Sequence, residues 1–145
     1  IMRMESGFLH WGHDISPEEN QYQAGLNFAI SFKKYFNFIG KEKLLEIKDQ
    51  KIDKKFIMLV LKDSKPGNPL LLHEEPIYLN DKIIGKTTSG NHSFNYNKNI
   101  SFGYIKSDLS TNELSKQKLF IEVEKKKYPA HIILKPLKQS NFKKS

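Results

Sequence analysis

The residues best suited to chemistry lie together near the start of the chain, in residues 3–14. This stretch holds the only arginine and the only tryptophan, Arg3 and Trp11, and two of the five histidines. A guanidinium binds carboxylates and phosphates through paired N–H donors, and indole and imidazole rings stack or donate hydrogen bonds. Gly12 and the pair Ser16-Pro17 predict turns. We therefore expect a polar loop that carries its side chains outward from a rigid frame.

His10 and His13 are three residues apart, a spacing that could place two imidazoles on one metal ion if the segment were helical. Gly12 argues against a helix, and the only other suitable ligand nearby is Asp14. We therefore expect polar loop or interface histidines and no metal site.

Arg3 and Glu5 lie two residues apart at the end of an expected helix. Arg3 could pair with a ligand carboxylate, and Glu5 could accept hydrogen bonds from ring or amide donors. Both could equally form structural ion pairs with neighbouring elements, and the sequence leaves the two interpretations open. For Trp11, packing as an anchor of the loop is the favoured interpretation. The chain has no Gly-x-Ser-x-Gly and no Gly-x-Gly-x-x-Gly pattern, so nucleophilic catalysis has low weight and no phosphate cradle is expected.

The composition excludes several classes of protein. The chain has 145 residues and no cysteine, which excludes a disulfide-stabilised extracellular scaffold and a thiolate metal site. The longest apolar runs are too short to cross a bilayer. We expect a soluble, cytoplasmic protein without a membrane partner.

The net charge of +8 supports nucleic-acid binding only weakly, because all but one of the 24 basic residues are lysine. Arginine, rather than lysine, suits base edges and phosphate forks. Residues 1–46 hold five basic and six acidic residues (net −1), and residues 47–145 hold nineteen and ten (net +9), which indicates two structural parts. The alternative function is a basic barrel that binds single-stranded nucleic acid or docks a partner without catalysis, with stacking faces on Phe94, Tyr96, Phe102 and Tyr104.

Three elements are predicted in the first fifty residues. Residues 1–5 have the pattern of the last turn of a helix that Gly7 ends. Alternating apolar residues predict a half-buried strand over residues 20–32. Gly40 then precedes a short amphipathic helix over residues 41–50.

Residues 51–145 have a different pattern, with short apolar runs separated by turn residues. The predicted strands are residues 56–61, 76–79, 82–88, 101–105, 119–124 and 130–134. Asn80-Asp81 predicts a hairpin, and residues 125–127 predict a tight turn. The fold class is therefore mainly β, with an antiparallel six-stranded β-barrel or jelly roll preceded by a small α+β piece.

Ordered sequence motifs extend over almost the whole chain, beginning with RMESGFLHWGHDI at residues 3–15. The others are AGLNF (24–28), FIGKEKL (38–44), EEPI (74–77), IGKTTSG (84–90), ISFGYI (100–105) and YPA (128–130). In this order they resemble the glycine-cleavage T-protein family, the tetrahydrofolate-dependent aminomethyltransferases. The HWGHDI string and the LKPL of residues 134–137 are most similar to the folate-binding half of dimethylglycine and sarcosine dehydrogenases.

The resemblance implies that the chain is part of a longer protein. Residues 1–50 would be the end of an incomplete ferredoxin-like subdomain, and residues 51–145 would be the family's C-terminal β-barrel domain. The implied cofactor of the intact protein is tetrahydrofolate, with FAD only if that protein is a dehydrogenase. The implied partners are the missing N-terminal portion of the same polypeptide, folate and a lipoyl carrier protein. Uncovered apolar residues in residues 1–50 predict self-association of this chain alone.

The resemblance also suggests which residues contact the cofactor. The family's catalytic aspartate and its pterin-contacting glutamate belong to the missing portion, so this chain alone is not expected to catalyse the reaction. The cofactor-binding residues implied in this chain are Arg3, Glu5, Trp11, Asp14 and Phe142. Phe142 falls about where the family has a tyrosine, so it would keep a stacking face without the hydroxyl.

Overall fold

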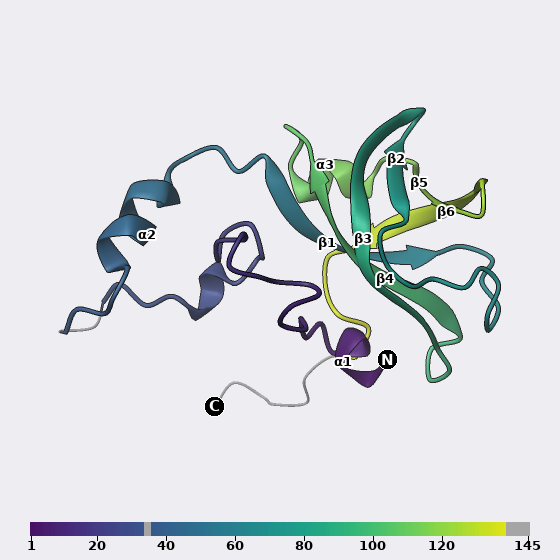
Figure 1. Ribbon diagram of the computed structural model, residues 1–145, viewed down its shortest axis with the longest axis horizontal. Coiled ribbons are helices and arrows are strands. Elements are labelled where there is room, and N and C mark those ends of the chain that lie inside the picture. The colour runs from purple at the N-terminus through teal and green to yellow at the C-terminus, as the bar shows by residue number, and fades with distance from the viewer. Residues whose placement is uncertain (34–35, 139–145) are drawn as a thin grey trace.

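The computed structural model describes residues 1–33 and 36–138 and has a closed barrel as its main body (Figure 1). Six antiparallel strands close in the order β1-β4-β3-β2-β5-β6. Their bounds are β1 (Lys54–Leu61), β2 (Pro76–Leu79), β3 (Lys82–Ser93), β4 (Lys98–Lys106), β5 (Leu119–Val123) and β6 (Lys126–Ile133). The mainly β, six-stranded barrel predicted from the sequence is therefore confirmed.

Side chains from both faces of β1 are packed. Ile57 and Leu59 belong to the interior cluster of the barrel, because alternate residues of a strand point to the same face. Phe56 and Met58 point the other way and pack in a second cluster with Met4. This outer cluster joins the start of the chain to the barrel wall.

The predicted strands agree with the structure in number and place, but β1, β3, β4 and β6 are longer than expected and β6 begins four residues earlier. The tight turn lies at Glu124 and Lys125, whose φ angles are 49° and 63°, so the prediction of residues 125–127 was one residue late. A short helix, α3 (Thr111–Ser115), was not predicted. Its signal is present in the sequence, because Ser110 and Glu113 form a capping box.

Strand β3 contains a β-bulge beside β4. Thr87 pairs with Gly103 and Ser89 pairs with Phe102, so Thr88 is an extra residue on the β3 side. A bulge interrupts the strict alternation of side chains along a strand. Thr88 and Ser89 therefore need not point to opposite faces.

Residues 1–50 contain short helical elements. These are α1 (Met2–Glu5), the 3-10 helix η1 (Asn27–Ala29) and α2 (Lys41–Lys48). Gly7 follows α1 with a φ of 77°, as predicted for a helix-ending glycine. Figure 1 shows α1 against the barrel and α2 well away from it. None of the described helices is long and apolar enough to span a membrane.

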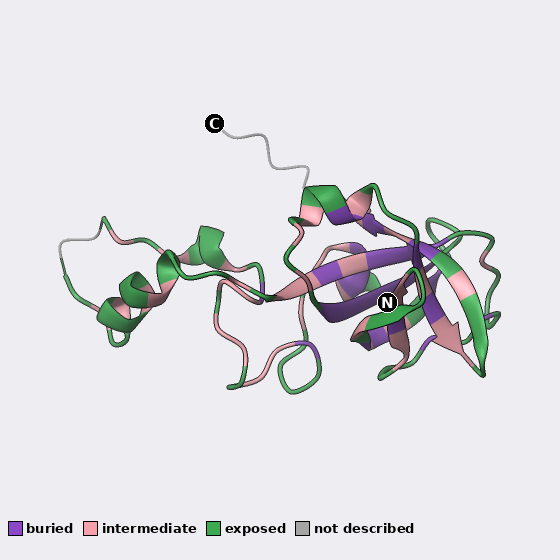
Figure 2. Ribbon diagram, turned by 90° about the horizontal axis from the view of Figure 1, so that it is seen from above, coloured by how far each residue is buried: buried purple, intermediate pink, exposed green. Residues whose placement is uncertain are grey.

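The predicted strand over residues 20–32 was wrong. The described part of this segment has turns and η1 instead, and the side chain of Phe28 is 82% exposed. An alternating pattern becomes a strand only beside another strand, and no strand lies within the described residues of 1–50. Figure 2 shows the contrast in burial between the described part of residues 15–50, which we call the arm, and the barrel. The assignment of residues 1–50 to a ferredoxin-like subdomain stays a prediction.

Candidate functional site

Arg3, in α1, points its guanidinium at β3 and at the loop that follows α1. One terminal nitrogen, Nη1, donates to the carbonyl of Phe8 at 3.0 Å and to Oδ2 of Asp14 at 2.6 Å. The other, Nη2, donates to the hydroxyl of Ser89 at 2.8 Å. The side chain remains 32% exposed. Arg3 therefore connects α1, the loop and the barrel while keeping one edge open.

Asp14 is buried under this guanidinium, with no exposed side-chain surface. Its carboxylate also accepts hydrogen bonds from the backbone N–H of His10 at 2.9 Å and from the hydroxyl of Thr88 at 2.6 Å. Burial alone raises the pKa of a carboxyl group, but these hydrogen bonds and the Arg3 charge outweigh it and lower the pKa of Asp14. Asp14 is therefore held as a carboxylate.

Glu5 is 2% exposed and bonds to the hairpin between β3 and β4. The hydroxyl of Ser93 donates to it at 2.6 Å and the amide of Asn95 at 3.0 Å. These two hydrogen bonds lower its pKa. The backbone carbonyl of Glu5 accepts a hydrogen bond from the backbone N–H of Lys138 at 2.8 Å. We use the name attachment cluster for Arg3, Glu5 and Asp14 with their strand and hairpin partners Thr88, Ser89, Ser93 and Asn95.

The structure shows how far each residue predicted to bind the cofactor is already engaged, and folate contacts by these residues stay a prediction. Glu5 and Asp14 are buried and bonded within the protein, whereas Arg3 bonds to structural partners and keeps an exposed edge. Trp11 is 67% exposed, so its interpretation as a packing anchor was wrong and its ring is open for stacking. Phe142 lies outside the described residues.

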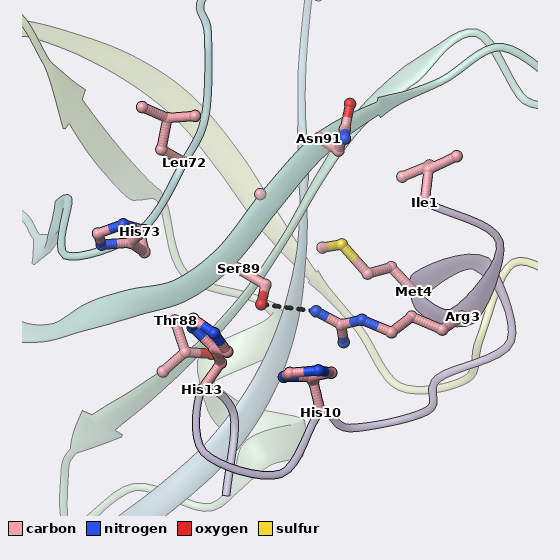
Figure 3. Close-up of a pocket in the computed structure, with 11 residues that line it drawn as sticks. Ile1, Arg3, Met4, His10, His13, Leu72, His73, Thr88, Ser89 and Asn91 are labelled. Carbon is pink, nitrogen blue, oxygen red and sulfur yellow. Dashed lines mark hydrogen bonds between the residues drawn. The ribbon is translucent and has the colours of Figure 1, made fainter.

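A cleft of about 370 Å³ opens beside Arg3 (Figure 3). We call it the histidine cleft. It is lined by Ile1, Arg3, Met4, His10, His13, Leu72, His73, Thr88, Ser89, Gly90 and Asn91. The rings of His10 and His13 have centroids 4.9 Å apart. The described residues contain no group of three or more metal-ligating side chains, so we assign no metal to this cleft.

Residues 54–138 match the family of the glycine cleavage T-protein C-terminal barrel domain. The chain belongs to this family. A crystal structure of the glycine cleavage system aminomethyltransferase T from Bartonella henselae has the same fold, with a TM-score of 0.77 and 21% identity. That match covers 93% of this chain and 36% of the other.

Curated relatives extend the similarity beyond the barrel. Human mitochondrial dimethylglycine dehydrogenase is 35% identical over 94% of this chain and 15% of its own length. The formaldehyde-forming 4-methylaminobutanoate oxidase of Paenarthrobacter nicotinovorans is 31% identical over 93% of this chain and 16% of its length. The aminomethyltransferase of Listeria welshimeri is 35% identical over 93% and 35%. The chain thus spans only 15% to 35% of the length of these relatives.

The barrel of this T-protein family member offers few of the stacking faces proposed for nucleic acid. Phe94 is exposed and Tyr96 partly so, but Phe102 is fully buried and Tyr104 nearly so. Two of the four rings are therefore closed to bases, which counts against the nucleic-acid alternative.

Sequence reasoning missed the barrel half of the attachment cluster. Thr88 and Ser89 come from β3, Ser93 ends that strand and Asn95 follows it. The run of hydroxyl residues at 87–89 in a strand was the available signal, because a barrel strand otherwise favours apolar side chains. His73 was also missed, since it lies in a loop far along the chain from His10 and His13.

Proposed function

We propose that this chain is the C-terminal part of a tetrahydrofolate-dependent aminomethyltransferase or of a folate-coupled methylamine dehydrogenase. One observation carries the proposal: relatives with the names aminomethyltransferase and dimethylglycine dehydrogenase align with 93% to 94% of the chain. The alignment therefore includes most of residues 1–50 as well as the barrel. A barrel domain used alone in another kind of protein would not be expected to retain residues 1–50 as well.

The task proposed for this chain is to position the segment of residues 3–14 in the intact enzyme. The attachment cluster binds α1 and the loop to β3 through charged hydrogen bonds, which are stronger than neutral ones. The exposed Trp11 ring is the proposed stacking face toward folate. Because Glu5 and Asp14 are occupied, we derive no chemical step from them and assign the reacting groups to the rest of the polypeptide.

The proposed partners follow from the two kinds of relative. The upstream portion of the same polypeptide and folate are common to both proposals. A lipoyl carrier protein belongs to the aminomethyltransferase proposal alone, and FAD belongs to the dehydrogenase proposal alone. The cytoplasm is the proposed compartment, and a mitochondrial location, as in the name of the human relative, is the alternative.

The test begins with the intact mass of the native protein and the length of its reading frame. The full polypeptide is then assayed for one-carbon transfer to tetrahydrofolate with sarcosine, dimethylglycine and an aminomethylated carrier protein as donors. We expect transfer by the full polypeptide and none by residues 1–145 alone. Visible flavin absorption in the full polypeptide selects the dehydrogenase. A frame that ends with these 145 residues, or a longer protein that does not bind folate, contradicts the proposal.

A further inference from the structure

The histidine cleft concentrates hydrogen-bond donors from three separate parts of the chain. Arg3 comes from α1, His10 and His13 from the loop that follows it, and His73 from the loop before β2. Asn91, in β3, lies on the remaining wall (Figure 3). Three of the five histidines of the chain thus line one small cleft together with its only arginine.

The lining contains donors and no carboxylate. Asp14, the nearest described acidic partner of Arg3, is buried behind the guanidinium. Of the five N–H donors of a guanidinium, Phe8, Asp14 and Ser89 accept three, so Arg3 retains donors on its exposed edge. The side-chain carbonyl of Asn91 accepts a hydrogen bond from the backbone N–H of His92 at 2.7 Å. The amide N–H donors of Asn91 therefore point away from that bond.

The three imidazoles are also accessible to a ligand. His10, His13 and His73 are all exposed. Within the described residues no side-chain hydrogen bond of theirs ties two elements together, whereas His92 in the barrel is buried and bonded to Asn99 at 2.6 Å. A neutral imidazole keeps one N–H donor and a protonated one has two. Side chains of this kind are available to a ligand.

We propose that the histidine cleft binds a small oxyanion, a phosphate or a carboxylate group, between Arg3 and the three imidazoles. Oxyanions accept several hydrogen bonds at once, and Arg forms charge-assisted bonds with them. The cleft volume of about 370 Å³ lies at the small end of ligand sites, so the cleft has room for an oxyanion group and the small molecule that carries it. The inference is independent of the proposed function, because it needs only the residues of this chain.

The test is a titration of the chain with inorganic phosphate and, separately, with citrate, at constant ionic strength. Backbone amide NMR shifts report the site. We expect saturable shifts confined to residues 10–14, 72–73 and 88–91. Saturation by phosphate alone identifies a phosphate ligand, and tighter saturation by citrate identifies a polycarboxylate ligand. Since no donor amine or folate is present, failure here leaves the transfer assay of the full polypeptide unaffected.

Two variants connect the shifts to the cleft. His13→Ala and His73→Ala should each weaken binding about tenfold, as expected for the loss of one hydrogen bond to a charged group. Lys82→Gln removes an exposed cation from another groove of the barrel and should leave the dissociation constant unchanged. His13→Gln and His73→Gln repeat the test if an alanine variant unfolds. Unsaturable shifts over the lysine-rich surface, or histidine variants that bind as wild type does, overturn the proposal.

Discussion

The barrel and the arm of residues 15–50 are two regions of one chain that differ in how completely their own residues stabilise them. Every barrel strand pairs with a neighbour on each side, and side chains such as Leu59, Ile77 and Ile121 are fully buried. In the arm, α2 has no buried residue and no side-chain cap, and Ile39 is fully exposed. The barrel thus supplies its own packing, whereas the arm presents an apolar surface that the described residues do not cover.

Removing a barrel side chain should give the largest effect. Ile121→Ala should lower the free energy of unfolding by about 2–5 kcal/mol, because it leaves a cavity in the closed interior. Denaturant unfolding monitored by circular dichroism measures the change. The matched arm variant Ile39→Ala should change the free energy by less than about 0.5 kcal/mol. Equal losses in the two variants would show that Ile39 is packed in solution and would contradict the contrast between barrel and arm.

Breaking the attachment cluster should give the next largest effect, and it acts where residues 3–14 join the barrel. Asp14→Ala removes the acceptor shared by Arg3, Thr88 and the His10 amide, so we expect a loss of about 1–3 kcal/mol. Amide hydrogen exchange should accelerate in residues 3–15 and stay slow in β1, β4 and β6. Glu18→Ala, an exposed neighbour in the loop, is the control and should leave both rates as they are.

Acidification should weaken the same attachment through Glu5. Its hydrogen bonds from Ser93 and Asn95 hold its pKa below the ordinary carboxyl value, so its contribution to stability is present above that value. The contribution is lost as the pH falls through the lowered pKa. We therefore expect the difference in melting temperature between wild type and Glu5→Gln to be constant near neutral pH and to shrink below about pH 4.

Thermal unfolding at a series of pH values measures this difference. Glu18→Gln, which alters an exposed carboxyl group, should run parallel to wild type over the whole series. If the Glu5→Gln melting temperature also runs parallel to wild type at low pH, protonation of Glu5 does not change the stability, and the prediction is wrong.

The two short helices should give the smallest effect. Ser110→Ala removes the capping box of α3, whose Leu114 is fully buried, and should cost about 1 kcal/mol. Glu42→Ala, in the first turn of α2, should cost less than about 0.5 kcal/mol. Denaturant midpoints of the two variants measure the contrast. A larger loss from Glu42→Ala would reverse the ranking of barrel and arm.

The difference between the barrel and the arm also explains how much of the fold could be predicted from the sequence. The strands of the barrel were found because alternating apolar residues, the turn at Asn80-Asp81 and their regular spacing are local signals. The predicted strand over residues 20–32 was wrong because an alternating pattern forms a strand only beside another strand. The sequence of this segment does not show whether such a strand is present. The helix α3 was missed although its capping residues, Ser110 and Glu113, were visible.

The candidate site shows a further limit of sequence reasoning. The charged residues Arg3, Glu5 and Asp14 were found because charge in a short aromatic-bearing segment is conspicuous. Whether they contact a ligand or the protein itself depends on Ser89 and Ser93, which lie more than eighty residues further along the chain. Neutral hydroxyl groups in a strand give little sign of such a role.

The extra residue in β3 limits how this part of the chain can vary. A regular strand offers only every second side chain to a given neighbour, yet Thr88 and Ser89 are consecutive and bond to Asp14 and Arg3, an ion pair on one segment. Deleting Thr88 would restore regular pairing with β4 and remove one of these two bonds. The bulge in β3 therefore allows two consecutive residues to bond to the ion pair. The number of residues in this strand matters to the site as much as the charges of Arg3 and Asp14.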